Sequence, residues 1–140
     1  RMVKITTLNR RPVAQPSDWP SIKEMPRQHA IVHPQRQFGA KDMKKICRGF
    51  IPTTQDQRWF IYFTSNRLRL HRSWTGFLIY DVGFEFDFKG GASIADIVVN
   101  RNGRQYKSKD DENDLNLLYE VIQQYLLQPV PSYSLEVPRN

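Results

Sequence analysis

The sequence is short of cysteine, of long apolar runs and of glycine-rich motifs, and each absence excludes a class of protein. Its one cysteine, Cys47, has no partner for an internal disulfide and leaves no set of thiols for a zinc site. No run approaches the roughly 20 apolar residues of a membrane-spanning helix, and the first residues lack the apolar stretch of a secretory signal. We therefore expect a cytoplasmic protein that does not enter a membrane.

The glycine patterns that hold phosphates in P-loop and dinucleotide-binding proteins are also absent. The histidines are His29, His33 and His71, and no cysteine or carboxylate accompanies them at a recognised ligand spacing. Cys47 lies on the apolar side of a predicted helix, which favours a buried, inert thiol over a reactive one. We expect no metal ion and no cofactor.

Positive charge is what the chain has in excess, and it is unevenly spread. The 140 residues carry a net charge of +7 with an isoelectric point near 9.8, and 39% hydrophobic residues suffice for one packed domain. Residues 1–50 hold eleven Lys or Arg against three Asp or Glu, whereas residues 110–140 hold one against six. A basic protein attracts anionic partners, which include phosphate-bearing ligands, nucleic acids and acidic proteins.

Proline divides the chain into regions. Five of the nine prolines fall within the first 34 residues, and each fixes φ and removes a backbone donor. This pattern predicts an irregular basic N-terminal arm over residues 1–40, a single domain over 41–128 and a C-terminal tail over 129–140. Val3 to Leu8 is a candidate edge strand within the arm. The arm either lies across the domain or becomes ordered on a partner, and the sequence leaves both open.

Two segments have helical periodicity. The first places an apolar face, at the spacing i, i+3, i+4 and i+7, on Met43, Ile46, Cys47 and Phe50, and a strand from Ile46 to Ile51 stays open as the alternative to this short helix. The second, which Pro129 ends, carries an apolar stripe over Leu115, Leu118, Tyr119, Ile122, Tyr125 and Leu126. The acidic residues at its start need no functional explanation, because carboxylates there cap free amides and suit the helix dipole. These are Asp110, Asp111 and Glu112.

The stretch between the two helices predicts an antiparallel meander. Strands are expected over residues 58–64, 67–72, 77–88, 93–100 and 104–108. The third is bent at Gly83, and Ser65-Asn66 and Asn102-Gly103 supply tight turns. The predicted fold class is α+β: an antiparallel β-meander of about five strands packed on one face by a C-terminal helix, with a proline-rich N-terminal arm.

A two-residue turn at Ser65-Asn66 determines which side chains share a face of the sheet. It pairs Phe63 with Leu68 and Ile61 with Leu70, which makes one apolar face. The opposite face then mixes cations with aromatic rings. Its members on the first two strands are Phe60, Tyr62, Arg67, Arg69 and His71.

A loop at Ser73-Trp74-Thr75 continues the meander. It is expected to bring Leu78 beside Leu70 and Tyr80 beside Leu68. Asp81 then lies near Arg67. We interpret the alternating Asp81, Glu85 and Asp87 as an ion-paired sheet surface rather than as catalytic carboxylates.

The mixed face suggests a binding surface. Guanidinium groups bind phosphate in a bidentate fork, and aromatic rings stack on bases. Exposed aromatic residues and arginines on a sheet are one general solution for binding single-stranded nucleic acid or nucleotides. Two alternatives stay open: the N-terminal arm covers these aromatic residues, or another protein docks on them.

The most unusual local sequence is the segment from His71 to Gly76, His-Arg-Ser-Trp-Thr-Gly. Loops held by rigid strands often carry binding groups, so Arg72, Ser73 and Thr75 are candidates for phosphate or ribose binding, with Trp74 stacking beside them. The alternative is a tight loop that uses Ser73 and Thr75 for turn hydrogen bonds, with Trp74 packed beneath. Catalysis by Ser73 with His71 is not expected, because nothing marks the third group that would orient the base.

Parts of the central region resemble a small uncharacterised bacterial domain that accompanies ADP-ribosylglycohydrolase and macro-type domains. The resemblance rests on Arg58-Trp59, the segment from Leu70 to Gly76, Ile79-Tyr80 and the acid-rich start of the last helix, and it covers residues 58–126. It implies a neighbourhood of ADP-ribose or nucleotide-linked signalling. No activity and no catalytic residues come with it.

The sequence therefore predicts a small non-enzymatic binding module for a phosphate-bearing partner, a nucleotide or a nucleic acid. The ligand-binding candidates are Phe60, Tyr62, Arg67, Arg69, His71, Arg72, Ser73, Trp74 and Thr75. The first alternative is a protein-interaction domain that docks on an acidic partner or on a second copy. The second is an enzyme acting on ADP-ribose or a related ester.

Overall fold

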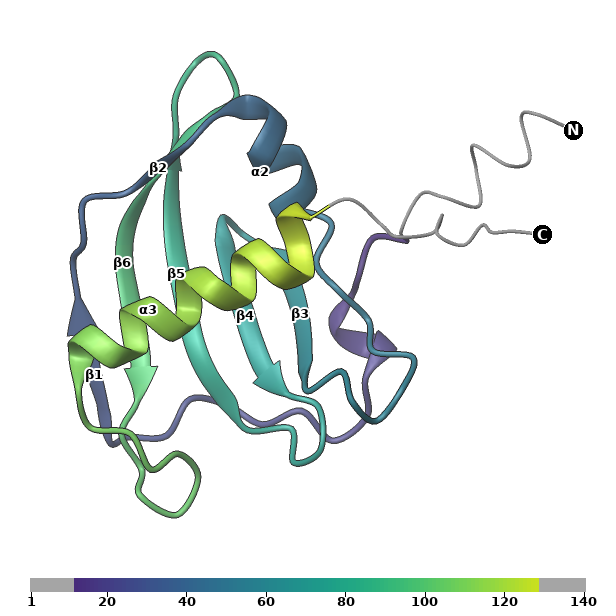
Figure 1. The fold of residues 1–140 in the computed structure, drawn as a ribbon, viewed down its shortest axis with the longest axis vertical. Helices are drawn as coiled ribbons and strands as arrows, with labels where there is room; N and C mark the ends of the chain where they lie inside the picture. The colour runs from purple at the N-terminus through teal and green to yellow at the C-terminus, as the bar shows by residue number, and fades with distance from the viewer. Residues whose placement is uncertain (1–11, 129–140) are drawn as a thin grey trace, which may run out of the picture.

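A computed structural model describes residues 12–128, and its core is a six-stranded antiparallel sheet. The strands are β1 (His29–Val32), β2 (Gln37–Phe38), β3 (Trp59–Thr64), β4 (Arg67–Arg72), β5 (Leu78–Phe86) and β6 (Ala92–Asn100). The helical elements are η1 (Pro16–Asp18), α2 (Ala40–Ile46), α3 (Asp111–Val121) and the π-helical η2 (Ile122–Leu127). Strands run in the order β1-β6-β5-β4-β3, and β2 also pairs with β6 (Figure 1). The predicted α+β class is confirmed.

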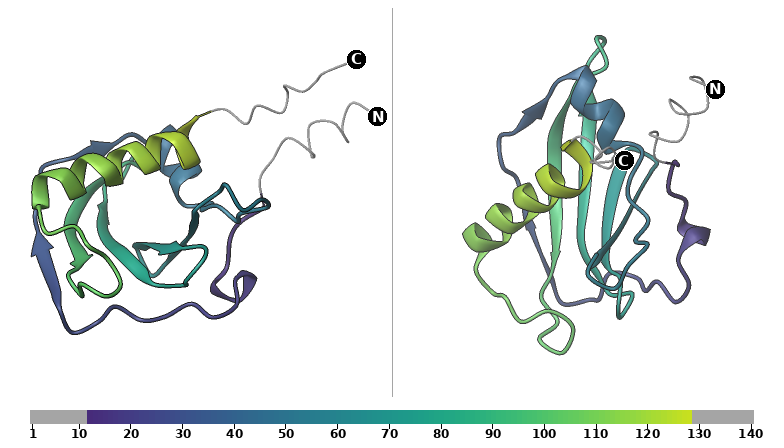
Figure 2. Two further views of the ribbon diagram at one scale, coloured as in Figure 1. Left: turned by 60° about the horizontal axis from the view of Figure 1, so that its bottom comes forward. Right: turned by 45° about the vertical axis from the view of Figure 1, so that its right-hand side comes forward.

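The sheet is curved, and its two faces have different coverings. Helix α3 crosses the concave face, while residues 12–28 run round the outside (Figure 2). Leu118, Ile122 and Leu126 of the helical segment are buried in the main core, as the helical stripe predicts. Asp110 caps α3 by accepting a hydrogen bond of 3.0 Å from the Glu112 amide, which confirms the capping interpretation. No described helix is long and apolar enough to cross a membrane.

The first hairpin has the predicted register. Ser65 and Asn66 have φ values of 51° and 63°, which a two-residue hairpin turn of this kind requires. Phe63 pairs with Leu68, and Tyr62 pairs with Arg69. The bend expected at Gly83 is also present, as a register shift between Gly83 and Phe84.

The next pairing differs from the prediction by two residues. Leu70 lies opposite Tyr80 rather than Leu78, and Leu68 lies opposite Val82 rather than Tyr80. The turn after β4 is longer than three residues, because the Arg72 amide bonds to the Phe77 carbonyl, and a bulge follows Leu70. A shift by two residues preserves the face on which each side chain lies, so the predicted separation of faces survives the error.

Two predictions about strands are wrong. Residues 29–38 are not irregular, because β1 and β2 both pair with β6. Residues 104–108 form no strand, because β1 and β2 already occupy the edge of β6 that such a strand would need. The rest of the described arm, residues 12–28, contains only the short η1. The candidate strand from Val3 to Leu8 and the tail over 129–140 lie outside the described residues.

The first predicted helix is confirmed but is shorter than its apolar pattern. It ends at Ile46, and Phe50 instead pairs with Ile61 in an isolated bridge. Gly49 makes this possible: its φ is 69°, and a Cβ atom there would lie 2.2 Å from the Ile61 carbonyl oxygen. Cys47 is half-buried, and burial raises the pKa of its thiol, which agrees with an unreactive side chain.

A candidate phosphate-binding pocket

The N-terminal arm covers the aromatic part of the sheet's outer face. Phe60 is 0% exposed and Tyr62 is 5% exposed. Trp19 of the arm stacks on Phe60 with ring centroids 5.7 Å apart, and Ala14 and Ile22 pack against the same cluster. The prediction that Phe60 and Tyr62 lie on an open face is therefore wrong. Apolar arm residues bury these rings, so the interpretation in which the arm lies across the domain is confirmed for residues 12–28.

His71 is buried with the same cluster. It is 2% exposed, its Nδ1 lies 2.9 Å from the Gly76 carbonyl oxygen, and its ring stacks on Tyr62. No side chain or backbone group of the described residues bonds to its Nε2. Burial lowers the pKa of His71 and so favours the neutral ring, in which Nδ1 donates to the carbonyl. His71 is therefore a core histidine, and its predicted contact with phosphate from an open face is wrong.

Two of the predicted phosphate-binding arginines are already paired with carboxylates. Arg67 Nε lies 2.6 Å from Asp81 Oδ1, and Arg67 Nη2 lies 2.9 Å from Asp96 Oδ2. Arg69 Nε approaches the other oxygen of Asp81 at 3.4 Å. Hydrogen bonds to Asp96 and Asp81 raise the pKa of Arg67 despite its partial burial. The predicted neighbourhood of Arg67 and Asp81 is confirmed, and an incoming phosphate would have to displace carboxylates here.

A different set of cations lines an open pocket at one end of the sheet. The pocket has a volume of about 420 Å³. Its lining residues are Arg58, Arg72, Trp74, Thr75, Phe77, Arg104, Gln105, Tyr106, Lys107 and Ser108. Four of them are cationic and none is Asp or Glu. Within residues 12–128, no carboxylate forms an ion pair with any of the four.

Chain connectivity explains why these cations meet. Arg58 immediately precedes β3, Arg72 ends β4, and Arg104 follows β6. In an antiparallel sheet the start of β3 lies at the same end as the end of β4 and the end of β6. The pocket therefore gathers side chains from three segments of the sequence at one end of the sheet, the end at which β4 and β6 terminate. Figure 1 shows this end at the bottom of the sheet.

Aromatic rings hold two of the arginines in place. The guanidinium carbon of Arg58 lies 4.0 Å from the ring centre of Trp74. That of Arg72 lies 4.8 Å from the ring of Trp59, whose side chain is buried. A guanidinium stacked on a ring keeps its N–H groups free at the edge of its plane. Arg58 and Arg72 are thus oriented without using the donors that a phosphate would need.

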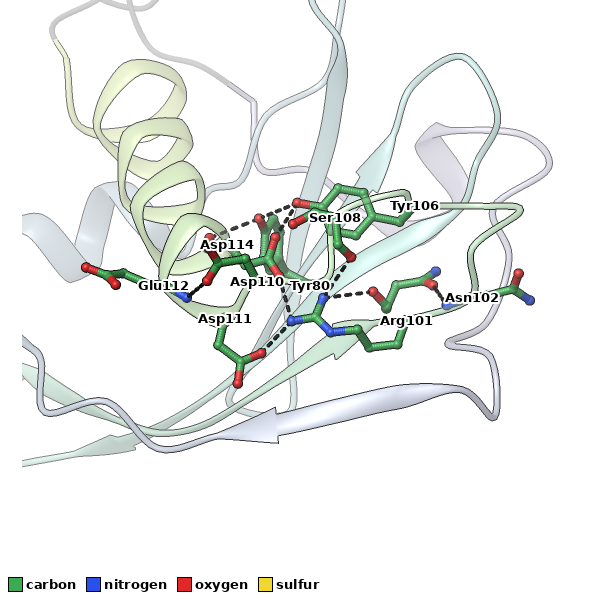
Figure 3. A network of polar contacts seen from close by, with 10 residues as sticks. Tyr80, Arg101, Asn102, Tyr106, Ser108, Asp110, Asp111, Glu112 and Asp114 are labelled. Atoms are coloured by element: carbon green, nitrogen blue, oxygen red, sulfur yellow. Dashed lines mark hydrogen bonds and ion pairs between the residues drawn. The ribbon is translucent and has the colours of Figure 1, made fainter.

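The wall that carries Arg104 and Lys107 is fastened to the start of α3. Tyr106 is buried and donates a 2.7 Å hydrogen bond to Asp114 Oδ1 (Figure 3). Arg101 forms ion pairs with Asp111 and with Asp114, the latter at 2.6 Å though not aligned as a hydrogen bond. Burial raises the pKa of Tyr106, which stays protonated and keeps donating to the carboxylate. These contacts hold residues 104–108 against the domain.

The remaining sequence candidates lie in the turn between β4 and β5. Ser73 is almost buried, and its Oγ donates 2.8 Å to the Gln57 carbonyl oxygen. Thr75 lines the pocket, and its Oγ1 accepts a hydrogen bond of 3.3 Å from the Phe77 amide. The turn interpretation is thus confirmed for Thr75, whereas the Ser73 hydroxyl bonds outside the turn, to the segment that precedes β3. Its companion prediction, that Trp74 packs beneath the loop, is wrong, because Trp74 is 63% exposed.

The structure brings together part of the predicted set and adds residues that the sequence did not reveal. Arg72, Trp74 and Thr75 line the pocket, whereas Ser73 is not among its lining residues. Arg58, Arg104 and Lys107 were not predicted as ligand contacts. Arg58 carried a usable signal, since it lies at the predicted start of a strand next to the predicted end of the neighbouring one. Arg104 and Lys107 gave none, because the sequence predicted a strand over residues 104–108 where the structure has a loop.

Neither a metal site in the described residues nor a known relative indicates what the pocket binds. The described residues contain no group of three or more His, Cys, Asp or Glu side chains placed to hold a metal ion. No family model, curated protein or solved structure matches the chain. What the protein binds is therefore inferred from the pocket's own geometry and charge.

Proposed function

We propose that the protein is a non-enzymatic binding module for a phosphate-bearing ligand, a nucleotide or a nucleic acid, which binds in the basic pocket. One observation supports this most strongly. Four cations, Arg58, Arg72, Arg104 and Lys107, line one cavity whose lining contains no carboxylate. Like charges gathered without counter-charges repel one another, and a bound dianion removes this cost while gaining charge-assisted hydrogen bonds.

The pocket's size and preorganisation also favour such a ligand. Its volume of about 420 Å³ falls within the roughly 300–1,000 Å³ of small-molecule sites. Arg58 and Arg72 are stacked on indoles before any ligand arrives, so little side-chain entropy is lost on binding.

Binding rather than catalysis is proposed because the two candidate reactive groups are engaged elsewhere. The Ser73 hydroxyl donates to the Gln57 carbonyl, and the buried His71 ring bonds to the Gly76 carbonyl. Activation of a hydroxyl requires a base within hydrogen-bond reach of it. The alternative of a protein docking on the aromatic sheet face loses its surface, because the arm buries Phe60 and Tyr62.

The test compares two pairs of arginines. ADP and a short single-stranded oligothymidylate are titrated against the wild type, the Arg72→Gln/Arg104→Gln variant and the Arg67→Gln/Arg69→Gln variant at two salt concentrations. We expect the first variant to bind at least about ten-fold more weakly and to show a shallower salt dependence, since each lost contact to the oligonucleotide reduces the slope by about 0.7.

The second variant provides the matched control, because it removes the same number of charges from the carboxylate-paired arginines. Its affinity should stay within about two-fold of the wild type, which is the change expected from net charge alone at moderate salt. Unchanged binding by the Arg72→Gln/Arg104→Gln variant, or no binding of either ligand by the wild type, contradicts the proposed function.

A further inference from the structure

A second hollow lies beside the basic pocket and differs from it in chemistry. Its volume is about 590 Å³. It is lined by Trp19, Pro52, Thr53, Thr54, Gln55, Ser73 and Trp74. None of these side chains is charged, and two are indoles. We call it the tryptophan groove. Trp74 lines both this groove and the basic pocket, so the two hollows adjoin at one ring.

Both indoles of the groove are fixed in position. Trp19 Nε1 donates 3.0 Å to the Ser73 carbonyl oxygen, and Trp19 also stacks on the buried Phe60. Trp74 Nε1 donates 3.0 Å to the Gln55 carbonyl oxygen. Each N–H is therefore satisfied by backbone, and the rings are held before a ligand arrives.

The exposure of Trp74 is the unusual feature. The Arg58 guanidinium covers one face of its ring, and its N–H edge is tied to Gln55, yet 63% of the residue remains open to water. A large apolar ring that is rigid and exposed loses hydrophobic stabilisation that a folded chain normally gains. A planar ligand stacked on the open part of the ring would recover it.

We propose that the tryptophan groove binds the base of a nucleotide whose phosphate occupies the basic pocket. This inference depends on the proposed function and narrows its ligand to the nucleotide class. A nucleotide joins an uncharged planar ring to a phosphate through one sugar, and the molecule places an uncharged indole-lined groove beside a cationic pocket in the same way. Trp74 is the ring on which the base stacks, and its neighbour Thr75 lines the pocket on the phosphate side.

Stacking on an indole predicts tolerance of base identity, because every base presents a π-face. The side chains of Thr54 and Gln55 line the groove and supply polar atoms for the edge of the base. Thr53 is committed elsewhere, since its hydroxyl bonds to the Gln57 side chain. We therefore expect AMP and UMP to bind with similar affinities.

The experiment uses ligands that differ only in the base. AMP and ribose 5-phosphate carry the same sugar and phosphate, and each is titrated calorimetrically against the full chain. AMP should bind about ten-fold more tightly or better, which corresponds to one stacked base. The Trp74→Leu variant should lose that advantage; the loss of the ring on which Arg58 stacks should weaken both ligands to the same extent, so the ratio of the two affinities is the readout. Trp74→Phe should keep most of the advantage. Arg72→Gln should weaken both ligands by the same factor.

The outcomes distinguish a failure of this inference alone from a failure of the proposed function. Equal affinity of the wild type for AMP and ribose 5-phosphate overturns the base site and leaves phosphate binding intact, and this comparison needs no variant. An AMP advantage that survives in Trp74→Leu also overturns it. If neither ligand binds, the proposed function fails together with the inference.

Discussion

Two regions that involve β3 and β4 combine arginines with aromatic rings, and they differ in whether a ligand can reach the arginines. The first, the covered face, consists of Phe60, Tyr62, Arg67, Arg69 and His71 on β3 and β4. The second, the basic pocket, draws Arg58 and Arg72 from the ends of the same two strands. The composition of the two regions is similar. Their difference comes from what the rest of the chain places against them.

Counter-charges and the arm account for that difference. On the covered face, Asp81 and Asp96 neutralise Arg67, and Trp19 seals the rings. In the basic pocket the arginines contact indoles instead of carboxylates, so they keep both their charge and their donors. An arginine near an aromatic residue in the sequence is therefore a candidate for ligand binding only when no Asp or Glu side chain forms an ion pair with it.

The largest expected effect on stability distinguishes Trp19, which covers the buried rings, from the exposed Trp74. Trp19→Ala removes the ring that covers Phe60, together with a hydrogen bond to the Ser73 carbonyl, and should lower the free energy of unfolding by about 2 kcal/mol. Trp74→Ala removes a ring that is 63% exposed and should cost about 0.5 kcal/mol. Urea denaturation of both variants measures the difference.

These two variants are matched, since each deletes an indole whose N–H bonds to a backbone carbonyl. Equal losses of stability would mean that the arm does not seal the covered face. Trp74→Ala should nevertheless weaken AMP binding, because Trp74 lines the basic pocket. Its small effect on stability leaves the fold intact.

The sequence predicts well what depends on neighbouring residues. The Ser65-Asn66 turn sets the register of β3 and β4, and the helical stripe around Leu118 and Ile122 sets the face that α3 buries. The Asp110 cap follows from the same local rules. In each case the deciding interaction lies within a few residues along the chain, so a pattern of spacing carries enough information.

It predicts poorly what depends on distant segments. Residues 29–38 lack a strong strand pattern, and only the free edge of β6 makes them strands. Once that edge is occupied, residues 104–108 become a loop, and Arg104 reaches the pocket. Likewise, Phe60 satisfies the pattern of an exposed strand position, and only Trp19, which is 41 positions earlier in the sequence, buries it. The spacing of residues along the chain does not show which distant segment pairs with a strand edge or covers a side chain.

The buried histidine gives a pH test of the covered face. Burial lowers the pKa of His71 below its ordinary value and outweighs the hydrogen bond to Gly76 and the nearby Asp81, while the Arg69 charge acts in the same direction as burial. The unfolded chain therefore takes up a proton at a pH where the folded chain does not. Stability should be complete above about pH 6.5 and should fall as the pH drops below it, by at most about 1.4 kcal/mol per pH unit.

The matched variant is His71→Asn, whose amide can donate to the Gly76 carbonyl in place of Nδ1–H but does not titrate. Denaturation midpoints of both proteins are measured between about pH 8 and about pH 5, on either side of the ordinary histidine pKa of about 6.5. His71→Asn should be less stable at high pH and should lose less on acidification. Parallel pH profiles for the two proteins would show that the ring is not sealed from water.

The smallest expected effect distinguishes the paired arginines from the open ones most directly. Arg67→Gln leaves Asp96 without its ion-pair partner and Asp81 with only the longer contact to Arg69, and it should destabilise the fold by about 1 kcal/mol, a modest value because the Arg67 side chain is 29% exposed and screened. Arg58→Gln removes a cation that has no carboxylate partner among the described residues, and it should change stability by less than about 0.5 kcal/mol. Added salt should reduce the Arg67 effect, because screening weakens the ion pairs. Urea denaturation at low and high salt measures the free energy of unfolding of both variants. A loss in Arg58→Gln as large as that in Arg67→Gln would mean that the pocket's cations stabilise the fold rather than remain available to a ligand.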